Sequence, residues 1–345
     1  MDADSIAAFW DPIIKAGKET AMIHAGLELQ IWAKVAAGHH TAHDLAEHET
    51  WDPTGTRALL DALFAIGLLE KDEAGYQLAP IAEQTLLPGS PAYEGNGVLM
   101  EWAGLGNSPL AQAIRTGKRP VITDLTSEGE AASWASFAST HGFRAPDLVV
   151  PQWFWSLVDS FWHAAGIEAH DGLRVLDIGC GPGVISMALA RQNPGVHATL
   201  LDRTPALDLA RAVAEKLNLR RQLTMLPGDM RALNYGRSQF DVALFSYCLM
   251  FFSPEEHVNL LHKAYNALAP GGTLVLSQYI ADDARRKRKS ALRNALWIYA
   301  SSAQGDAYTT SQCKGFVERA GFVNVIEKEF ILDEEEAALI LGTKP

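Results

Sequence analysis

Residues 174–184 read Arg-Val-Leu-Asp-Ile-Gly-Cys-Gly-Pro-Gly-Val, a sequence that predicts a strand, a glycine turn and the start of a helix. Its apolar start, from Val175 to Ile178, is typical of a buried strand. Three glycines then let the backbone turn tightly and approach a ligand closely: Gly179, Gly181 and Gly183. A helical pattern begins at Val184, so the turn leads into a helix N-terminus, whose free N–H groups favour an anionic group. A dinucleotide-binding fingerprint needs glycine in place of Val184, so that pattern is not met.

Strand and helix patterns alternate from residue 173 onward, which predicts an α/β fold whose parallel sheet is covered on both faces. Asp202 ends the second strand nineteen residues after Gly183, where an acidic side chain can accept hydrogen bonds from ribose hydroxyls. Pro270-Gly271-Gly272 is expected to turn into the fifth strand. The six strands expected after the first are 199–202, 223–226, 241–247, 273–278, 322–328 and 337–342, and the helices are 204–217, 253–268 and one ending at Gly321.

The front of the chain has the pattern of a winged-helix module. Helices are expected over residues 5–38, 41–48 and 53–67, followed by a hairpin over 68–78. Thr41 and Asp52 are suitable N-caps, and the third helix should bury Ala58, Leu59, Leu60, Leu63 and Phe64. Between residues 41 and 75 there are eight Asp and Glu against Arg57 and Lys71 alone. A DNA-binding face needs clustered cations, so a structural or dimerisation module is the better interpretation.

Two groups of residues allow more than one structural interpretation. The histidines at 39, 40, 43 and 48 lack a recognisable metal-ligand pattern and are interpreted as surface residues. Residues 92–170 have a helical pattern and many aromatic residues, which are either core or the roof of a substrate cavity.

The composition indicates an ordinary globular protein of two domains, with 345 residues, 48% hydrophobic and 20% charged. A net charge of −12 argues against broad binding to nucleic acid or an anionic membrane. The three cysteines are far apart, which favours free thiols in a reducing compartment over disulfides or zinc. No signal peptide or membrane-spanning run is recognisable, so we expect a cytoplasmic protein.

Taken together, these motifs resemble the hydroxyindole- and caffeate-type O-methyltransferases that use S-adenosylmethionine (SAM). The resemblance covers nearly the whole chain and rests on the winged-helix front, the glycine turn, Leu201-Asp202, Gly228-Asp229-Met230 and Ala269-Pro270-Gly271-Gly272. It implies a Rossmann-like seven-stranded class I methyltransferase domain, preceded by a mainly helical winged-helix dimerisation domain. The implied domains are 1–90 (dimerisation), 91–170 (helical linker and roof) and 171–345 (SAM-binding catalytic domain), and the implied assembly is a homodimer.

The resemblance also implies a cofactor site for SAM, whose product is S-adenosylhomocysteine. The glycines of the turn, beside Asp177, would make room for the methionine part of SAM. Asp202 would hold the ribose, Asp229 the adenine amino group, and Met230 would pack on the adenine. The remaining candidates lie beside these residues or at the end of the fourth strand: Arg203, Gly228, Ser246 and Tyr247.

The family's catalytic pattern is missing. Its Leu-His-Asp-Trp after the fourth strand, with a histidine that deprotonates a phenol, corresponds here to Leu249-Met250-Phe251-Phe252. Its two supporting acids correspond to Gln278 and Ala307. Because the residues at all these positions are non-basic, the departure from the family's pattern favours an acceptor that needs no deprotonation.

A thioether sulfur is such an acceptor, since it is nucleophilic without losing a proton. The chain is therefore also similar to the methylthiohydroxybutyrate S-methyltransferases of dimethylsulfoniopropionate synthesis. Met250, Phe251, Phe252, Trp297 and Tyr299 would line the acceptor pocket, and Arg144 or His141 would bind the carboxylate of the acceptor.

The sequence also allows other interpretations. The acceptor could be an aromatic or polycyclic metabolite methylated on carbon, nitrogen or oxygen, with His141, His163, Tyr247 or Tyr279 as a relocated base. The protein could also bind SAM without transferring a methyl group, whereas a winged-helix repressor is disfavoured by the acidic front. The basic run at 285–289 is interpreted as a solvated loop, with attraction of an anionic substrate as the alternative.

Overall fold

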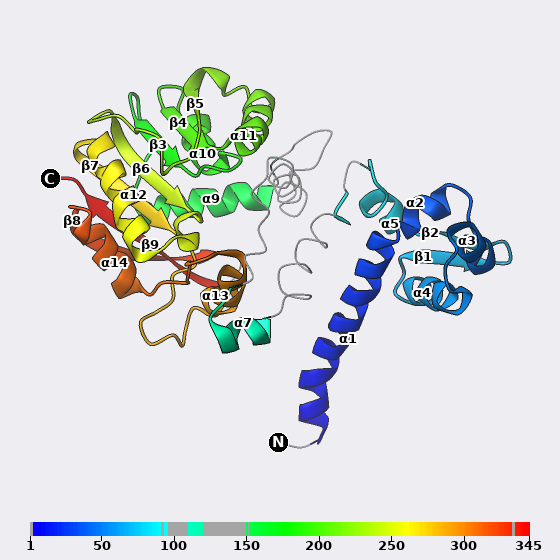
Figure 1. The fold of residues 1–345 in the computed structure, drawn as a ribbon. Coiled ribbons are helices and arrows are strands. Elements are labelled where there is room, and N and C mark those ends of the chain that lie inside the picture. The colour runs from blue at the N-terminus through cyan, green and yellow to red at the C-terminus, as the bar shows by residue number, and fades with distance from the viewer. Residues whose placement is uncertain (1–2, 91–92, 96–109, 120–149, 151, 333–334) are drawn as a thin grey trace. The chain divides into compact units, whose positions relative to one another are not determined.

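The computed structural model describes residues 3–90, 93–95, 110–119, 150, 152–332 and 335–345. These residues form two compact units (Figure 1). The first contains the described residues up to Gly95, and the second contains those from Leu110 onward.

The first unit has the expected helices and hairpin. Helix α1 spans Ala3–Glu28 and ends before Gln30, whose φ of 54° separates it from α2 (Ile31–Ala36). Next come α3 (Ala42–Glu49), α4 (Pro53–Ala65), the antiparallel pair β1 (Leu69–Asp72) and β2 (Gly75–Leu78), and α5 (Pro80–Thr85).

Both predicted helix caps of this unit are confirmed. The side chain of Thr41 accepts a hydrogen bond from the Asp44 N–H, and that of Asp52 accepts one from the Gly55 N–H. The predicted inner face of α4 is partly wrong. Leu60 and Leu63 are fully buried, but Ala58 and Phe64 are exposed because the helix presents only a narrow stripe to the core.

The second unit is built on a seven-stranded sheet in the order β5-β4-β3-β6-β7-β9-β8. Strands β3 to β7 are parallel, while β9 runs antiparallel to both of its neighbours. The strands are β3 (Arg174–Ile178), β4 (His197–Asp202), β5 (Leu223–Pro227), β6 (Phe240–Ser246), β7 (Leu268–Ser277), β8 (Val323–Leu332) and β9 (Glu335–Thr343). The helices are α7 (Leu110–Thr116), α9 (Gln152–Ala165), α10 (Val184–Gln192), α11 (Thr204–Lys216), α12 (Pro254–Ala267), α13 (Lys289–Ser301) and α14 (Thr310–Arg319), with short 3-10 turns η2 (Arg220–Gln222) and η3 (Leu249–Phe251).

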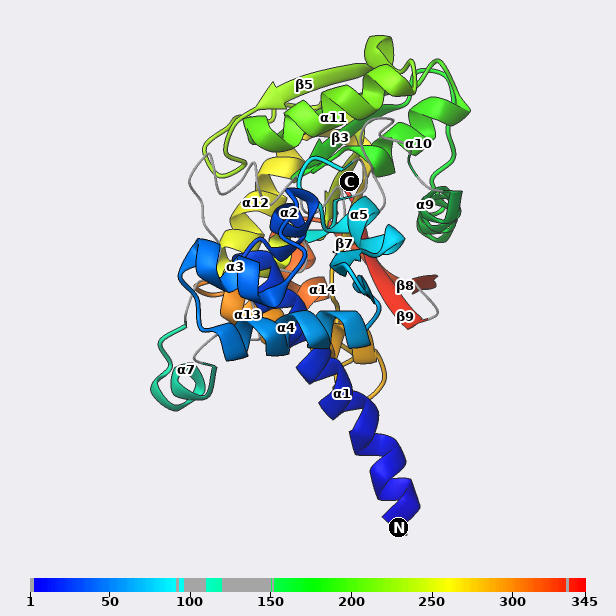
Figure 2. The ribbon, with the colours of Figure 1, turned by 90° about the vertical axis from the view of Figure 1, so that its right-hand side faces the viewer.

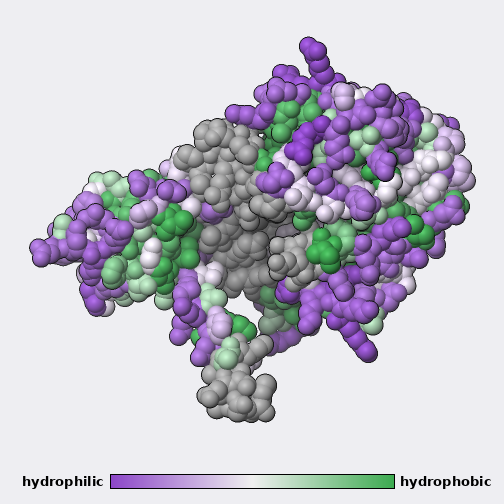
Figure 3. Space-filling model, turned by 180° about the vertical axis from the view of Figure 1, so that it is seen from behind, coloured by the Kyte–Doolittle hydropathy of each residue, from purple (hydrophilic) through white to green (hydrophobic). Residues whose placement is uncertain are grey.

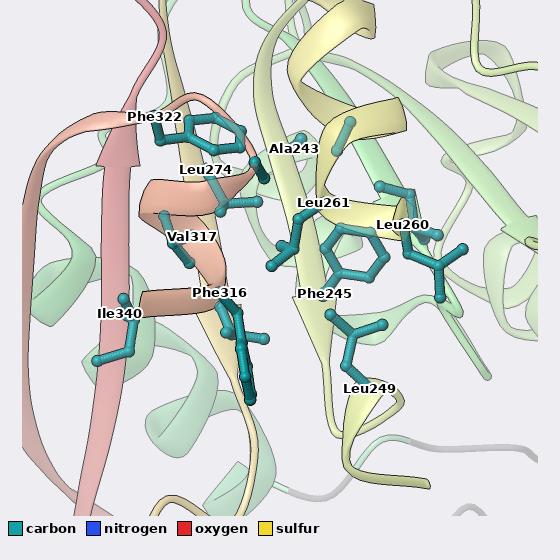
Figure 4. Close-up of a cluster of buried hydrophobic side chains, with 14 of the residues drawn as sticks. Ala243, Phe245, Leu249, Leu260, Leu261, Leu274, Phe316, Val317, Phe322 and Ile340 are labelled. Atoms are coloured by element: carbon teal, nitrogen blue, oxygen red, sulfur yellow. The ribbon is translucent and has the colours of Figure 1, made fainter. Parts of the chain in front are cut away.

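Side-chain alternation along β3 separates the two faces of this sheet. Leu176 and Ile178 belong to the apolar core formed with α12 and α14, part of which is drawn in Figure 4. Asp177 points to the other face, where its carboxylate accepts a hydrogen bond from Ser186 of α10. Helices α9 and α11 pack against α10, so the sheet is covered on both faces, as predicted (Figures 1 and 2).

Three aromatic residues of α9 are part of the core of the second unit. Trp155, Phe161 and Trp162 are all buried, and the Trp162 Nε1–H donates to the Ile185 carbonyl of α10 at 2.7 Å. Most of the other aromatic positions predicted for the roof lie outside the described residues.

Two predicted loops have more structure than expected. Pro270 to Gly272 lie within β7, where the pairing with β6 shifts register, rather than in a turn before the strand. In the basic run, 285–287 and 289 are exposed, but Arg288 is buried and donates to Thr310, Glu327 and Glu329. The interpretation of a wholly solvated run is therefore wrong, because β8 supplies two carboxylates that local sequence does not reveal.

Polar residues cover most of the second unit's surface seen in Figure 3, with apolar residues in small groups. No helix among the described residues has the length and apolarity needed to cross a membrane. Within the described ranges, no three His, Cys, Asp or Glu residues are arranged to hold a metal ion. Two histidines of the predicted surface group pair locally with Asp44 and Glu49.

Candidate functional site

The candidate cofactor residues meet at the carboxyl ends of four adjacent parallel strands. Strand β3 lies between β4 and β6, and the chain changes direction there, which is where open α/β sheets bind ligands. The glycine turn follows β3, Asp202 ends β4, Gly228 to Met230 follow β5, and Ser246 and Tyr247 lie at the end of β6.

The glycine turn requires glycine for its backbone. Gly179, Gly181 and Gly183 have φ values of 69°, 54° and 71°, a region that other residues rarely adopt. A Cβ on Gly179 would lie only 2.8 Å from both Cys248 Cβ and Met230 Cε. Gly183 is the N-cap of α10, so the free N–H groups of that helix begin at the turn.

Two carboxylates lie beside this turn. The Asp202 carboxylate accepts hydrogen bonds from the N–H groups of Gly181 (2.8 Å) and Arg203 (2.7 Å), which leaves its remaining lone pairs for a ligand. Burial raises the pKa of Asp202, although both hydrogen bonds oppose the shift.

Asp177 is only 1% exposed, and burial raises its pKa to about 7, with the nearby charge of Asp202 adding to the rise. Its Oδ2 accepts a bond of 2.6 Å from the Ser186 hydroxyl, while Oδ1 has no partner among the described residues. A buried acceptor without a donor is costly, so this oxygen fits a ligand donor or cation at the turn.

The residues after β5 are more open. Asp229 pairs with Arg231 at 2.6 Å, and this hydrogen-bonded guanidinium lowers the pKa of the carboxyl group. Met230 packs partly buried against the core of the second unit, and its Cε approaches Gly179. These positions bring the predicted adenine-binding residues to the same edge of the sheet as the turn.

Tyr247 directly follows β6 and has an unusual backbone conformation. Its φ of 53° is left-handed, and such backbone strain in non-glycine residues gathers at functional sites. Its ring meets that of Tyr279 edge-on at 5.1 Å, and burial raises the pKa of its phenol. Beside it, the Ser246 hydroxyl is buried without a hydrogen-bond partner among the described residues.

The turn η3 carries Met250, the residue that the sequence resemblance aligns with the family's catalytic histidine. Met250 is 3% exposed and lies in a small apolar cluster with Ile298 and Ala307. Four aromatic side chains pack against that cluster: Tyr247, Phe251, Tyr279 and Trp297. The Phe251 and Trp297 rings meet at 5.4 Å, so the structure brings together most of the predicted acceptor lining.

Tyr299 lies apart from this cluster. Its hydroxyl donates to the Ala113 carbonyl of α7 at 3.1 Å, and its ring faces the guanidinium of Arg119. Tyr299 and Trp297 are two residues apart on α13, so they point to different sides of that helix. His141 and Arg144 lie outside the described residues.

Gln278 and Ala307, which the sequence resemblance aligns with the family's two supporting acids, have no side-chain group that can act as a general base. Gln278 is 2% exposed and donates from Nε2 to Cys313 Sγ at 3.4 Å, and Ala307 is fully buried. His163, named as an alternative base, is exposed on α9.

Sequence reasoning missed two residues near η3. The Asp306 N–H donates to the Met250 carbonyl at 3.1 Å, and Arg119 holds the preceding residue, Gly305, by its carbonyl. Neither contact has a local sequence signal, because each joins segments far apart in the chain.

Two family models match the chain in the order of the observed units. Residues 14–87 match an O-methyltransferase dimerisation domain, and residues 175–272 match a methyltransferase domain. The chain is 27% identical over 314 residues to the tetracenomycin polyketide synthesis 8-O-methyl transferase TcmO of Streptomyces glaucescens, covering 88% of both chains. It is also 31% identical over 150 residues to the L-tyrosine C(3)-methyltransferase of Streptomyces lavendulae, covering 43% of this chain and 41% of that protein.

The fold has a solved counterpart in human N-acetylserotonin methyltransferase in complex with SAM. That structure matches with a TM-score of 0.65 at 16% identity, covering 100% of this chain and 98% of the human one. The protein is thus a methyltransferase that uses SAM as methyl donor. In sequence and in domain order it is similar to the class I SAM-dependent O-methyltransferases, in which a dimerisation domain precedes the catalytic domain.

Proposed function

We propose that this enzyme methylates a small acceptor that gives no proton to a general base, and that the favoured acceptor is the thioether sulfur of a small acid of the 4-methylthio-2-hydroxybutyrate type. The observation that carries the proposal is the side-chain set at three positions. Met250, Gln278 and Ala307 stand where the family resemblance expects a histidine and two acids, and all three are buried and cannot ionise.

Methyl transfer to a thioether sulfur needs no ionisable residue at these three positions. SAM supplies a methyl group on a positively charged sulfur. The acceptor sulfur uses a lone pair to form the new carbon–sulfur bond, the old bond breaks onto the leaving sulfur, and no proton moves. The protein needs only to align these atoms in a dry pocket, and such positioning can contribute about 7–11 kcal/mol. The aromatic faces around Met250 would stabilise the sulfonium product by about 0.5–2 kcal/mol each.

The cofactor roles are part of this proposal. The φ values of the glycine turn and the unpartnered Asp177 Oδ1 support a site for the methionine part of SAM, with Oδ1 facing a cationic group. We propose that Asp202 and Arg203 hold the ribose, that Gly228, Asp229 and Met230 bind the adenine, and that Ser246 and Tyr247 face the cofactor and acceptor. We also propose that residues 1–90 pair two copies of the chain, which the match to a dimerisation domain supports.

A second candidate is methyl transfer to carbon, nitrogen or oxygen of an aromatic metabolite. It is favoured by the names of the relatives, which include an O-methyl transferase of polyketide synthesis and a tyrosine C-methyltransferase. The difficulty for this second candidate is to identify a general base that removes the proton of the acceptor. Tyr247 is a poor candidate because burial raises the pKa of its phenol and keeps it protonated.

An acceptor panel tests the proposal. Purified protein is incubated with SAM and with thioethers, phenols, amines and aromatic amino acids, and products are detected by mass spectrometry. A thioether acceptor gains a methyl group and a permanent positive charge. Methylation of phenols with no transfer to any thioether would contradict the proposal and favour the second candidate.

The pH profile and a variant pair refine this test. Because a thioether has no proton to lose, its kcat/KM at saturating SAM should be constant between about pH 6 and 9, whereas that of a phenol should rise with pH. Met250→His restores an imidazole and should add phenol methylation without raising thioether methylation. Met250→Leu, which keeps the pocket apolar, is the matched control.

A further inference from the structure

Arg119 is a cation near the acceptor lining that neither family model includes. It follows α7, and its Nη1 donates to the carbonyls of Gly305 (2.7 Å) and Ser302 (3.4 Å). Its guanidinium carbon also lies 4.5 Å from the centre of the Tyr299 ring. The stack and the two hydrogen bonds hold the guanidinium in one orientation.

These contacts place Arg119 one loop away from the position of the missing base. Gly305 packs directly on η3, where a Cβ on it would overlap the Met250 carbonyl and approach Phe251 Cα to 2.8 Å. The next residue, Asp306, donates its N–H to the same carbonyl. The loop that Arg119 holds is therefore the loop that supports η3.

The charge of Arg119 is not compensated within the described part of the chain. Arg119 is half-buried, and no described carboxylate lies within ion-pair distance of it. The nearby Asp306 carboxylate pairs instead with Arg285 at 3.3 Å. Because Nη1 of Arg119 already donates to two carbonyls, the edge formed by Nε and Nη2 remains for a ligand. This edge can donate two parallel hydrogen bonds to a carboxylate. A partly buried cation without an opposite charge nearby is costly, which favours an anion there.

We propose that Arg119 binds a carboxylate of the acceptor and so selects acidic acceptors. The inference rests on the proposed function, because it names the other end of the acceptor whose nucleophilic atom lies near Met250. A fixed cation is also what a chain of net charge −12 needs to hold an anionic acceptor.

The test compares acids with their uncharged esters on native enzyme and three variants. Arg119→Met removes the charge and keeps an unbranched side chain. Arg119→Lys keeps the charge but cannot donate two parallel hydrogen bonds. Arg115→Met, which removes an exposed cation of α7, is the matched control. The acceptors are 4-methylthio-2-hydroxybutyrate and its methyl ester, and substituted hydroxybenzoates and their methyl esters. Affinity for S-adenosylhomocysteine is measured by calorimetry on each variant.

Native enzyme should prefer the acid of whichever pair it methylates. Arg119→Met should raise the KM for the acid about 10- to 100-fold more than the KM for the ester, since a charged hydrogen bond to the carboxylate is lost. Arg119→Lys should fall between, and Arg115→Met should behave as native. Affinity for S-adenosylhomocysteine should stay unchanged in all variants.

Equal losses for acid and ester in Arg119→Met would overturn the inference and leave Arg119 as a support of the loop. A native enzyme that does not distinguish acid from ester would overturn it too. If the proposed function is wrong, only the hydroxybenzoates and their esters are methylated. The acid–ester comparison for Arg119 is then made with that pair of acceptors.

Discussion

Replacing Asp177 by Asn should stabilise the protein without SAM while weakening SAM binding. Asp177 is buried beneath the glycine turn, and burial raises its pKa to about 7. In the unfolded chain its pKa is near 3.8. The folded state therefore penalises the ionised carboxylate, and the difference between these pKa values corresponds to about 4 kcal/mol.

The sign of the pH dependence follows from this difference. Because the folded state holds the proton more tightly, stability falls as the pH rises from about 4 to about 7 and then stays low. Asn cannot ionise, and its side-chain oxygen can still accept the hydrogen bond from Ser186. The variant should thus exceed the native protein in unfolding free energy by about 4 kcal/mol at pH 8, but by only about 1–2 kcal/mol at pH 5.

Urea unfolding followed by circular dichroism at both pH values measures these differences. Asp208→Asn, an exposed change on α11, is the control and should show little difference. SAM affinity should fall by about 10- to 100-fold in Asp177→Asn, because a charged partner for the ligand is lost. A stability difference that does not change with pH, or a variant less stable than native at pH 8, would refute the reasoning.

Three further changes have expected magnitudes. Gly183→Ala should cost about 1–2 kcal/mol, measured by urea unfolding, because the φ of 71° is strained for alanine while the Leu200 methyl can move away from the new Cβ. Arg288→Met should lower the unfolding free energy by about 2 kcal/mol at low salt, since it leaves the partner carboxylates of β8 without their cation; no change in the urea midpoint would show that this pair is dispensable. Trp162→Phe should cost about 1–2 kcal/mol by losing the bond to Ile185, and an unchanged melting temperature would contradict that estimate.

Local patterns predicted the parts of the fold that depend on neighbours in the chain. The helix caps at Thr41 and Asp52 and the helix start at Ser253 follow from residue types within one turn. The ends of β3, β4 and β6 follow from short apolar runs with clear boundaries. Because these ends lie at one edge of a parallel sheet, the cofactor candidates could be grouped before the structure.

The features missed by sequence depend on distant segments. Arg288 is buried because β8, some forty residues later, supplies its carboxylate partners. Arg119 reaches a loop more than 180 residues away. Phe64 fits the helical periodicity of α4, but its exposure depends on what lies opposite that helix. Hydrophobic periodicity predicts which residues share one face of a helix, but it does not predict which segment packs against that face.

The place of β9 in the sheet has a consequence for biosynthesis. Strand β8 is made before β9, yet β9 lies between β8 and β7. Until residues 335–343 leave the ribosome, β7 keeps an open edge of N–H and C=O groups, and β8 has no partner in the sheet. A nascent chain paused before β9 therefore carries an aggregation-prone edge, which makes this interval the natural point for chaperone protection.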